Sequence, residues 1–427
     1  MDSLLGDRQS ETSTPEGLPD APNVIDGHRL AGAAGVDVRY SPADGRRIGT
    51  FALSDSVDVQ AAVTVARRDF PAWASRTAVD RGNVLRRLAQ LLDEHADELV
   101  DLVGMETGKP RRDRLGELGA AVEMGYFIAG EGRRFYGRTM TSAVPHKSVS
   151  LHRVPIGVAG LIVAANTPLP NYAWKVFPAL LCGNAAVLKP SENTPLSATR
   201  FVELAHEAGV PAGVLGLLQG HGDVAGSALA GGEIDLLSFT GSAAVGRQIA
   251  ASTGARLVKT CLELGGKNPL VVCDDADLER AADAASLSAF SNAGQRCAAG
   301  SRLIVMDAVY EQFCELLLAR VERLNVGSGP DDDLGPVVSE RQLGHMLDAI
   351  DQARSAGVTV LTGGSRLTGT GYAGGCYLAP TLLEQPPRDS VVARDELFGP
   401  ISALYRVSSF SEAVDEANNT AYGLTGA

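Results

Sequence analysis

Apolar residues recur every three or four positions between residues 57 and 103, and charged residues fill the places between them. The run Val84, Leu85, Leu88, Leu91 and Leu92 shows this spacing most clearly. A repeat of this period places the apolar side chains on one face of an α-helix. We therefore expect this part of the chain to be helical, with one buried face.

From residue 157 the pattern changes to short apolar runs that alternate with helical segments. Strands are expected at residues 157–163, 185–188, 214–218 and 235–239, and helices at 172–181, 196–207 and 245–251. This β–α alternation is typical of a parallel, doubly wound sheet covered by helices on both faces. The predicted fold class is therefore α/β.

A second α/β region follows residue 263. Its strands are expected at 269–272, 303–305, 359–362, 378–382 and 401–407, and its helices at 278–290 and 310–324. The polar, alternating stretch around Pro145 predicts a projecting β-hairpin. A chain of 427 residues exceeds a single core. We expect an acidic disordered tail (1–20), a first α/β domain (21–136 and 154–262), the hairpin (137–153) and a second α/β domain (263–427).

Charge and composition narrow the classes of partner. The net charge is −13 and no basic run is present, which disfavours nucleic acid. No apolar window is long enough to span a bilayer, and the first residues do not form a secretory signal. Six scattered cysteines without CxxC spacing favour the reducing cytoplasm, and seven histidines without ligand spacing give no support for a metal site.

One strand-to-helix turn has the character of a phosphate site. Gly241 is expected to permit a tight turn, Ser242 to cap the helix, and Gly246 to allow close packing on the strand. The turn is not a P-loop and lacks GxGxxG, so an ordinary turn is the simpler interpretation. Lys189 and Glu192 follow an earlier strand and could hold ribose hydroxyls, or form only a solvated pair.

Three residues suggest covalent chemistry. Cys297 follows a polar, turn-forming stretch and is expected on an exposed loop, whereas the other five cysteines are expected to be inert and partly buried. Glu263, between Leu262 and Leu264, is expected to be half buried and suited to general base work, although a surface carboxylate is the simpler interpretation. Asn166 is either a turn residue or an amide donor to an oxyanion.

With these parts together, the chain resembles the NAD(P)-dependent aldehyde dehydrogenase family from about residue 40 to its last residue. The matching motifs are Glu106-Thr-Gly-Lys-Pro110, Asn166-Thr-Pro168, Leu188-Lys-Pro-Ser-Glu192, Phe239-Thr-Gly-Ser242, Leu262-Glu-Leu-Gly-Gly-Lys267, Gly294-Gln-Arg-Cys297 and Glu396-Leu-Phe-Gly-Pro400. Each motif alone is weak, but seven in the same order are specific.

The resemblance implies a role for each matching residue. Cys297 would be the nucleophile, Glu263 the general base, Asn166 the oxyanion donor and Lys175 part of a proton relay. The implied cofactor contacts are Ile162, Lys189, Ser191, Glu192, Gly241, Ser242, Gly246, Leu264, Glu396 and Phe398. The implied chemistry is attack of the thiolate on an aldehyde, hydride transfer to the nicotinamide, and hydrolysis of the resulting thioester.

The resemblance also bears on cofactor and substrate. A carboxylate at Glu192 favours NAD over NADP, because it accepts a ribose hydroxyl and repels a phosphate. Substrate tunnel positions match Thr167, Asn171, Trp174 and Arg296. Because Thr167 and Asn171 are polar, we expect a small polar aldehyde, and Gly130-Glu-Gly-Arg-Arg134 is shared with the semialdehyde-oxidising branch.

Members of that family continue for several dozen residues beyond the position of Ala427. The resemblance therefore implies a catalytic domain that is incomplete at its C terminus, and a homodimer or homotetramer whose hairpin lacks its partner strand. Two alternatives stay open: a reductase of the same fold that works on acyl phosphates or CoA thioesters, and a non-catalytic fragment. Glu263 counts against the reductase, because such relatives generally lack this glutamate.

Overall fold

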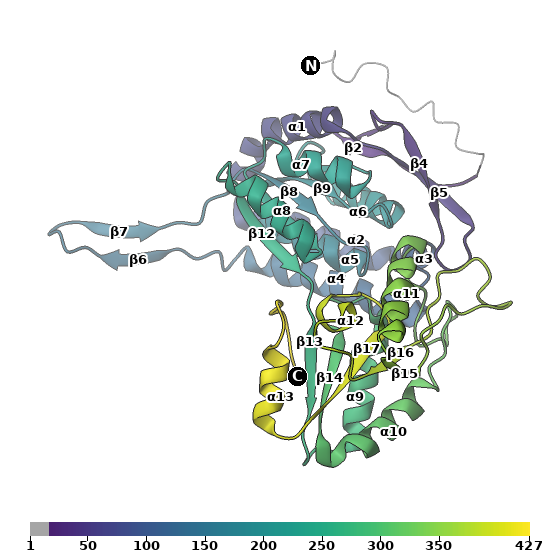
Figure 1. Cartoon of the computed structure of the whole chain (residues 1–427). Coiled ribbons are helices and arrows are strands. Elements are labelled where there is room, and N and C mark those ends of the chain that lie inside the picture. The colour runs from purple at the N-terminus through teal and green to yellow at the C-terminus, as the bar shows by residue number, and fades with distance from the viewer. Residues whose placement is uncertain (1–16) are drawn as a thin grey trace. The chain divides into compact units, whose positions relative to one another are not determined.

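The computed structural model describes residues 17–427 and divides into two compact units (Figure 1). The first unit comprises residues up to 39, 48–102 and 115–263. The second comprises residues 40–47, 103–114 and 264–427. Two short stretches from the N-terminal third thus cluster with the C-terminal part of the chain.

A seven-stranded sheet forms the centre of the first unit, in the order β12-β11-β8-β9-β10-β2-β3. Its strands are β2 (Asn23–Ile25), β3 (His28–Leu30), β8 (Val158–Ile162), β9 (Ala185–Lys189), β10 (Leu215–Leu217), β11 (Leu236–Gly241) and β12 (Lys259–Leu264). Strands β11, β8, β9 and β10 pair in parallel, which confirms the α/β prediction. The sheet is extended at one edge by two strands that the sequence pattern did not predict, where β2 pairs antiparallel with β10 and β3.

Every residue of β8 and β9 is buried, as expected for central strands covered on both faces. The helices of this unit are α1 (Ser56–Ser75), α2 (Ala78–Glu94), α5 (Pro168–Leu181), α6 (Pro195–Glu207), α7 (Ser227–Gly231) and α8 (Ala243–Gly254). A π-helical turn (Gly222–Gly226) precedes α7. Helices α3 (Ala96–Thr107) and α4 (Arg111–Glu131) each contribute to both units.

The expected helical stretch between residues 57 and 103 is confirmed as three helices. Two polar side chains mark where helices begin. Asp55 forms a capping box with Asp58 at the start of α1, and Thr77 accepts from the Asp80 N–H at the start of α2. Helix α4 was not expected from the sequence pattern.

A three-stranded sheet corrects the predicted tail. Strand β1 (Asp20–Ala21) pairs in parallel with β5 (Arg47–Ala52), and β5 neighbours β4 (Val36–Tyr40). Asp20 therefore lies in a strand, because its backbone extends an existing sheet edge. Residues 1–16, the rest of that predicted tail, lie outside the described residues.

The expected hairpin is confirmed as an antiparallel pair of β6 (Arg138–Thr141) and β7 (Ser148–Leu151). It extends away from the seven-stranded sheet of its own unit (Figure 1). All four residues of β6 are exposed. The pair has no other strand beside it in the described part of the chain.

A five-stranded sheet forms the centre of the second unit, in the order β13-β14-β17-β16-β15. Its strands are β13 (Asn268–Val272), β14 (Gly300–Met306), β15 (Thr359–Thr362), β16 (Thr381–Glu384) and β17 (Ile401–Val407). Its helices are α9 (Leu278–Phe290), α10 (Tyr310–Val321), α11 (Glu340–Ser355), α12 (Val391–Arg394) and α13 (Phe410–Asn418), with 3-10 turns at Ser291–Gly294 and Asp307–Val309.

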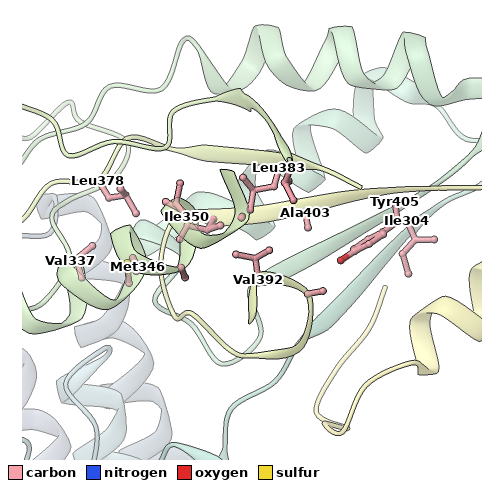
Figure 2. Packing of buried hydrophobic residues seen from close by; sticks show 14 of the residues in the cluster. Ile304, Val337, Met346, Ile350, Leu378, Leu383, Val392, Ala403 and Tyr405 are labelled. Atoms are coloured by element: carbon pink, nitrogen blue, oxygen red, sulfur yellow. The ribbon is translucent and has the colours of Figure 1, made fainter. Parts of the chain in front are cut away.

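Alternate residues of the central strands supply two separate cores. Leu303, Val305 and Leu404 pack with α9 and α10 on one face of the sheet. Ile304, Ala403 and Tyr405 join Met346, Ile350, Leu383 and Val392 in the other core (Figure 2). The period of two along β14 and β17 therefore explains why consecutive apolar residues, 303–305 and 403–405, are buried on both faces of the sheet.

Most element positions in this unit match the sequence pattern, and one strand is displaced. The strand expected at 378–382 instead spans Thr381–Glu384, because Leu378 makes only an isolated bridge with Arg366. Helices α11 and α13 were not expected. Among residues 17–427, no helix has the length and apolar character required to cross a membrane.

Candidate active site

Asn166 and Asn171 lie where β8 passes into α5. Asn166 is partly exposed in the connecting loop, and Thr167, also partly exposed, is the N-cap residue of α5, without a cap bond from its side chain. Pro168 at the first helical position suits this start, because its ring fixes φ in the helical range. Asn171 is only 2% exposed and its Nδ2 donates to the Asn166 Oδ1 at 3.1 Å.

Lys175 lies one helical turn after Asn171 and is buried in the first unit. Its Nζ donates to the Ser238 Oγ on β11 at 2.8 Å. Burial lowers the pKa of Lys175 to about 8, against the opposing attraction of Glu263 and Cys261. The ammonium therefore lies within electrostatic range of the Glu263 carboxylate and is half deprotonated at a pH of about 8.

Glu263 is exposed, which corrects the expectation that it is half buried. It lies on β12, where Lys259, Cys261 and Glu263 are exposed in alternation with less exposed residues. Strand β12 is at the end of the sheet order, and one of its faces carries these three exposed side chains. Leu262 and Leu264 point to the other face and do not cover the carboxylate. Cys261 is exposed as well, contrary to the expectation that all cysteines other than Cys297 are at least partly buried.

The carboxyl ends of three parallel strands bring the expected cofactor residues of the first unit together. Ile162 at the end of β8 is paired with Lys189 on β9 and with Phe239 on β11. Lys189 is 2% exposed, and burial lowers its pKa. The nearest carboxylate oxygen, on Glu192, is 4.0 Å from the Lys189 Nζ. A buried ammonium beside a carboxylate at this sheet edge fits the hydroxyl groups of a ribose.

The turn between β11 and α8 has a capped and exposed helix start. Ser242 is exposed and its Oγ accepts from the Val245 N–H at 3.4 Å. Gly246 is buried in the first turn. Gly241 has no left-handed backbone; a Cβ there would instead lie 2.4 Å from the Phe239 ring, so contact rather than turn geometry requires glycine. Helix-start N–H groups suit a pyrophosphate.

Ser191 and Glu192 belong to the turn that follows β9. The Ser191 Oγ accepts from the Asn193 N–H at 3.2 Å, and both Ser191 and Glu192 are partly exposed. Trp174 on α5 is 49% exposed. The predicted cofactor and tunnel residues of the first unit therefore include side chains that a ligand could reach.

Cys297 is exposed on a turn of the second unit, as predicted. The turn follows a 3-10 segment in which Asn292 and Ala293 have φ of 55° and 52°. Asn268, at the start of β13, donates through Nδ2 to the carbonyls of Cys297 (2.7 Å) and Ala299 (3.0 Å). These bonds fix the backbone of the turn while the thiol remains accessible. Arg296 is exposed beside it.

Gln295 anchors the other side of this turn. It is buried, donates through Nε2 to the Pro336 carbonyl at 3.2 Å and accepts through Oε1 from the Val338 N–H at 2.9 Å. Neither Gln295 nor Asn268 was assigned a role from the sequence. The signal was available for Gln295, since it lies inside the motif that contains Cys297.

Glu396 and Phe398 lie on the loop before β17. The Gly266 N–H donates to the Glu396 Oε1 at 3.2 Å, and burial raises the pKa of Glu396. Lys267 is buried and its Nζ donates to the Asp395 carbonyl at 2.8 Å, with burial lowering the pKa of Lys267 to about 8. Phe398 has φ of 53°, a left-handed backbone that is uncommon outside glycine. Leu264 is partly exposed beside the two glycines.

The predicted site residues thus form separate groups in the two units. Asn166, Lys175, Glu263 and the sheet-edge residues belong to the first. Arg296, Cys297, Leu264, Glu396 and Phe398 belong to the second. Among the described residues, no cluster of three His, Cys, Asp or Glu side chains could hold a metal ion.

Comparison with known proteins gives consistent matches. The sequence model that describes the aldehyde dehydrogenase family matches residues 34–427 of this chain. The chain is 36% identical over 408 residues to alpha-ketoglutaric semialdehyde dehydrogenase of Bacillus subtilis (strain 168), covering 94% of this chain and 84% of that protein. It is also 36% identical over 404 residues to glutarate-semialdehyde dehydrogenase of Pseudomonas putida, covering 94% and 83%.

A solved structure agrees with this result. The crystal structure of betaine aldehyde dehydrogenase from Staphylococcus aureus in complex with NAD⁺ superposes with a TM-score of 0.93 at 32% identity. The match covers 96% of this chain and 82% of that chain.

Proposed function

The chain belongs to the aldehyde dehydrogenase family, and on that premise we propose that it oxidises an aldehyde to a carboxylic acid with NAD as the acceptor. The observation that carries the proposal is the exposed thiol of Cys297 on a turn whose backbone is held by Asn268. A nucleophile needs an accessible sulfur at a fixed position. This turn provides both.

In the proposed reaction, the Cys297 thiolate attacks the aldehyde carbon, and the carbonyl oxygen becomes an oxyanion. The Asn166 amide and the Cys297 N–H donate to that oxygen. Bound NAD supplies the acceptor for the hydride that leaves the substrate carbon. Glu263 then takes a proton from water, the oxygen attacks the thioester, and the carbon–sulfur bond breaks to release the acid and the thiolate.

We assign Lys175 to the proton relay behind Glu263. The Lys175 ammonium is attracted electrostatically by Glu263. Its pKa of about 8 allows the lysine to exchange a proton near neutral pH. An exposed Glu263 is also compatible with a base that must lose its proton to solvent after each turnover. The first unit is proposed as the cofactor-binding domain and the second as the catalytic domain.

Burst kinetics test the two chemical roles. Cys297→Ser should lower kcat by more than about a thousandfold, because the hydroxyl is a much poorer nucleophile. Glu263→Gln should still release a burst of NADH and then turn over slowly, because only hydrolysis needs the base. Cys261→Ser is the matched control, since Cys261 is also exposed. Full turnover of Glu263→Gln would overturn the assigned base.

The proposed cofactor contacts are Ile162, Lys189, Ser191, Glu192, Gly241, Ser242 and Gly246 in the first unit, and Leu264, Glu396 and Phe398 in the second. We propose NAD over NADP because Glu192 lies beside Lys189, where its charge would repel a 2′-phosphate. Glu192→Gln should shift the kcat/KM ratio towards NADP by about tenfold. Glu207→Gln, on the surface of α6, should leave the ratio unchanged. An unaltered ratio in Glu192→Gln would remove the specificity argument.

We propose a small polar aldehyde, with semialdehydes as the leading candidates. The polar Thr167 and the exposed Arg296 support this, with Trp174 as an apolar surface of the same substrate region. Arg296→Gln should raise KM about tenfold for a carboxylated aldehyde and leave KM for a neutral aldehyde unchanged. Equal changes for both substrates would exclude Arg296 as a carboxylate contact.

We further propose a cytoplasmic homodimer or homotetramer. The six cysteines, all within residues 17–427, form no disulfide, which is compatible with a reducing compartment. The β6–β7 hairpin offers exposed strand edges to a second copy.

A further inference from the structure

We infer that Asn171 is a positioning residue that determines which end of the Asn166 amide is available to the reacting oxygen. This inference rests on the proposed role of Asn166 as the oxyanion donor. An asparagine side chain has a carbonyl oxygen at one end and an NH₂ group at the other, and only the NH₂ end can stabilise an oxyanion. A site that uses this amide therefore needs a means of preventing its reversal.

The Ala164 carbonyl determines the orientation of the Asn171 amide. The Asn171 Nδ2 donates to the Ala164 carbonyl oxygen at 3.1 Å. A backbone carbonyl can only accept, so the NH₂ end of Asn171, rather than its oxygen, must face Ala164. The second proton of that NH₂ group is then directed to Asn166.

The same Asn171 Nδ2 donates to the Asn166 Oδ1, also at 3.1 Å. Because this partner is a donor, the oxygen end of Asn166 must face Asn171. The amide is planar with its two ends opposed, so the Asn166 Nδ2 points away from Asn171. A fixed backbone carbonyl thus orients Asn171, and Asn171 orients Asn166.

Asn171 is held firmly enough for this task. Its side chain is 2% exposed, and its backbone N–H donates to the Thr167 carbonyl at 3.0 Å in the first turn of α5. Pro168 and Pro170 have their φ angles fixed by their rings. Lys175 follows Asn171 at i+4, so these two side chains lie on the same face of the helix. Asn171, expected from the sequence to line the substrate tunnel, acts in this proposal through Asn166.

Loss of Asn171 should leave Asn166 present but poorly oriented. Three χ1 wells and two amide orientations give about six arrangements of a released asparagine. If one of them is productive, the rate of the acylation step falls about sixfold, in proportion to the competent fraction. KM should change little, because the oxyanion exists only after attack.

The test is a double-mutant cycle on the NADH burst rate, which reports attack and hydride transfer. The single variants are Asn171→Ala, Asn171→Thr (close to asparagine in volume) and Asn166→Ala, and the double variant combines Asn166→Ala with Asn171→Ala. Tyr172→Phe is the matched control, because it removes a buried hydrogen bond to the Thr194 carbonyl from the adjacent position of α5. NAD binding and thermal unfolding of each variant verify the fold.

We expect Asn166→Ala to lose about 10²- to 10³-fold, and both Asn171 variants to lose about sixfold without a change in KM. In the Asn166→Ala background, Asn171→Ala should have less than a twofold further effect, because its target is absent. Tyr172→Phe should retain the full burst rate.

Three other results would be decisive against the inference or its premise. Wild-type burst rates in both Asn171 variants, alongside a large loss in Asn166→Ala, would overturn the positioning role and leave the proposed function intact. The same sixfold loss in both backgrounds would show that Asn171 acts independently of Asn166. An unchanged burst rate in Asn166→Ala would overturn the oxyanion assignment itself.

Discussion

Three buried lysines have a lowered pKa because burial disfavours their charged form: Lys175, Lys189 and Lys267. Lys189 and Lys267 lie in motifs shared with the family, and Lys175 is at a position to which the resemblance gave a role. A buried ammonium costs stability unless hydrogen bonds or charges offset the lost hydration. The proposed roles of Lys189 in cofactor binding and of Lys175 in proton transfer would account for their retention in the core despite this cost.

Lys175 gives the most direct prediction at this scale. Its folded pKa of about 8 is below its ordinary value of 10.5, so the folded protein binds fewer protons than the unfolded chain between these values. The free energy of unfolding therefore rises with pH across that window. Below pH 8 the lysine is charged in both states, and the full destabilisation by the buried charge applies. That cost is about 3 kcal/mol, and the hydrogen bond to Ser238 offsets about 1 kcal/mol.

Lys175→Met should consequently raise the free energy of unfolding by about 2 kcal/mol at pH 7, and the gain should shrink as pH approaches 10.5. Urea unfolding of both proteins at several pH values measures it. Lys259→Met is the control, because Lys259 is exposed on β12. A gain that does not depend on pH would mean that apolar packing, rather than the charge, is responsible.

The exposure of single residues was only partly predictable. The small polar neighbours of Cys297 indicated an exposed turn, and the structure agrees. For Glu263 the flanking leucines suggested burial, but they lie on the opposite face of an edge strand. Whether a strand is central or at the edge depends on pairing between distant segments, which local sequence does not contain. The bonds of Asn171 required coordinates for the same reason.

At the scale of elements, a side chain at the start of β13 is bonded to the turn that carries Cys297, the proposed nucleophile. Asn268 is 4% exposed and uses both amide protons on the carbonyls of Cys297 and Ala299. Its Oδ1 accepts from the Thr425 N–H at 3.3 Å. One side chain thus joins a strand end, the nucleophile turn and a C-terminal segment of the same unit.

Asn268→Ala should therefore loosen this turn. We expect a loss of about 1 kcal/mol in stability and about a tenfold lower NADH burst rate, because two partly buried hydrogen bonds are lost and the sulfur loses its fixed position. Urea unfolding and stopped-flow fluorescence measure the two effects. Ser402→Ala, which removes a buried hydrogen bond to the Gly300 carbonyl in the same sheet, should lower stability and retain the burst rate. Equal burst losses in both variants would argue against a specific role for Asn268.

The sequence pattern located strongly periodic elements well. Helix α9 and strands β15 and β17 have the predicted bounds. An apolar repeat defines α9, and a buried run defines β17. Helices α4, α11 and α13 were missed. Strands β2 and β3 were missed too, because their three residues each gain stability only by pairing with β10 or with each other.

At the scale of the whole molecule, the β6–β7 hairpin is the clearest surface for assembly. Leu151 and Met140 are exposed apolar residues within its strands. Replacement of residues 138–151 by a short Gly-Ser turn should reduce the proposed oligomer to a smaller species, because the exposed strand edges are lost. Light scattering after size exclusion measures the mass. Leu257→Ser, at the most exposed large apolar side chain in the described part of the first unit, should leave the mass unchanged. An unaltered mass in the hairpin variant would place the interface elsewhere.

The division of the chain into units has a consequence for biosynthesis. The backbone passes between the units after residues 39, 47, 102, 114 and 263. Segments 40–47 and 103–114 therefore leave the ribosome long before the residues that they pack against. For example, the Pro42 carbonyl accepts a hydrogen bond from the N–H of Cys376, which is synthesised much later. During that interval the nascent chain carries two unsatisfied segments that a chaperone could cover. For the same reason, a gene split at residue 263 would yield a first half that includes pieces of the second.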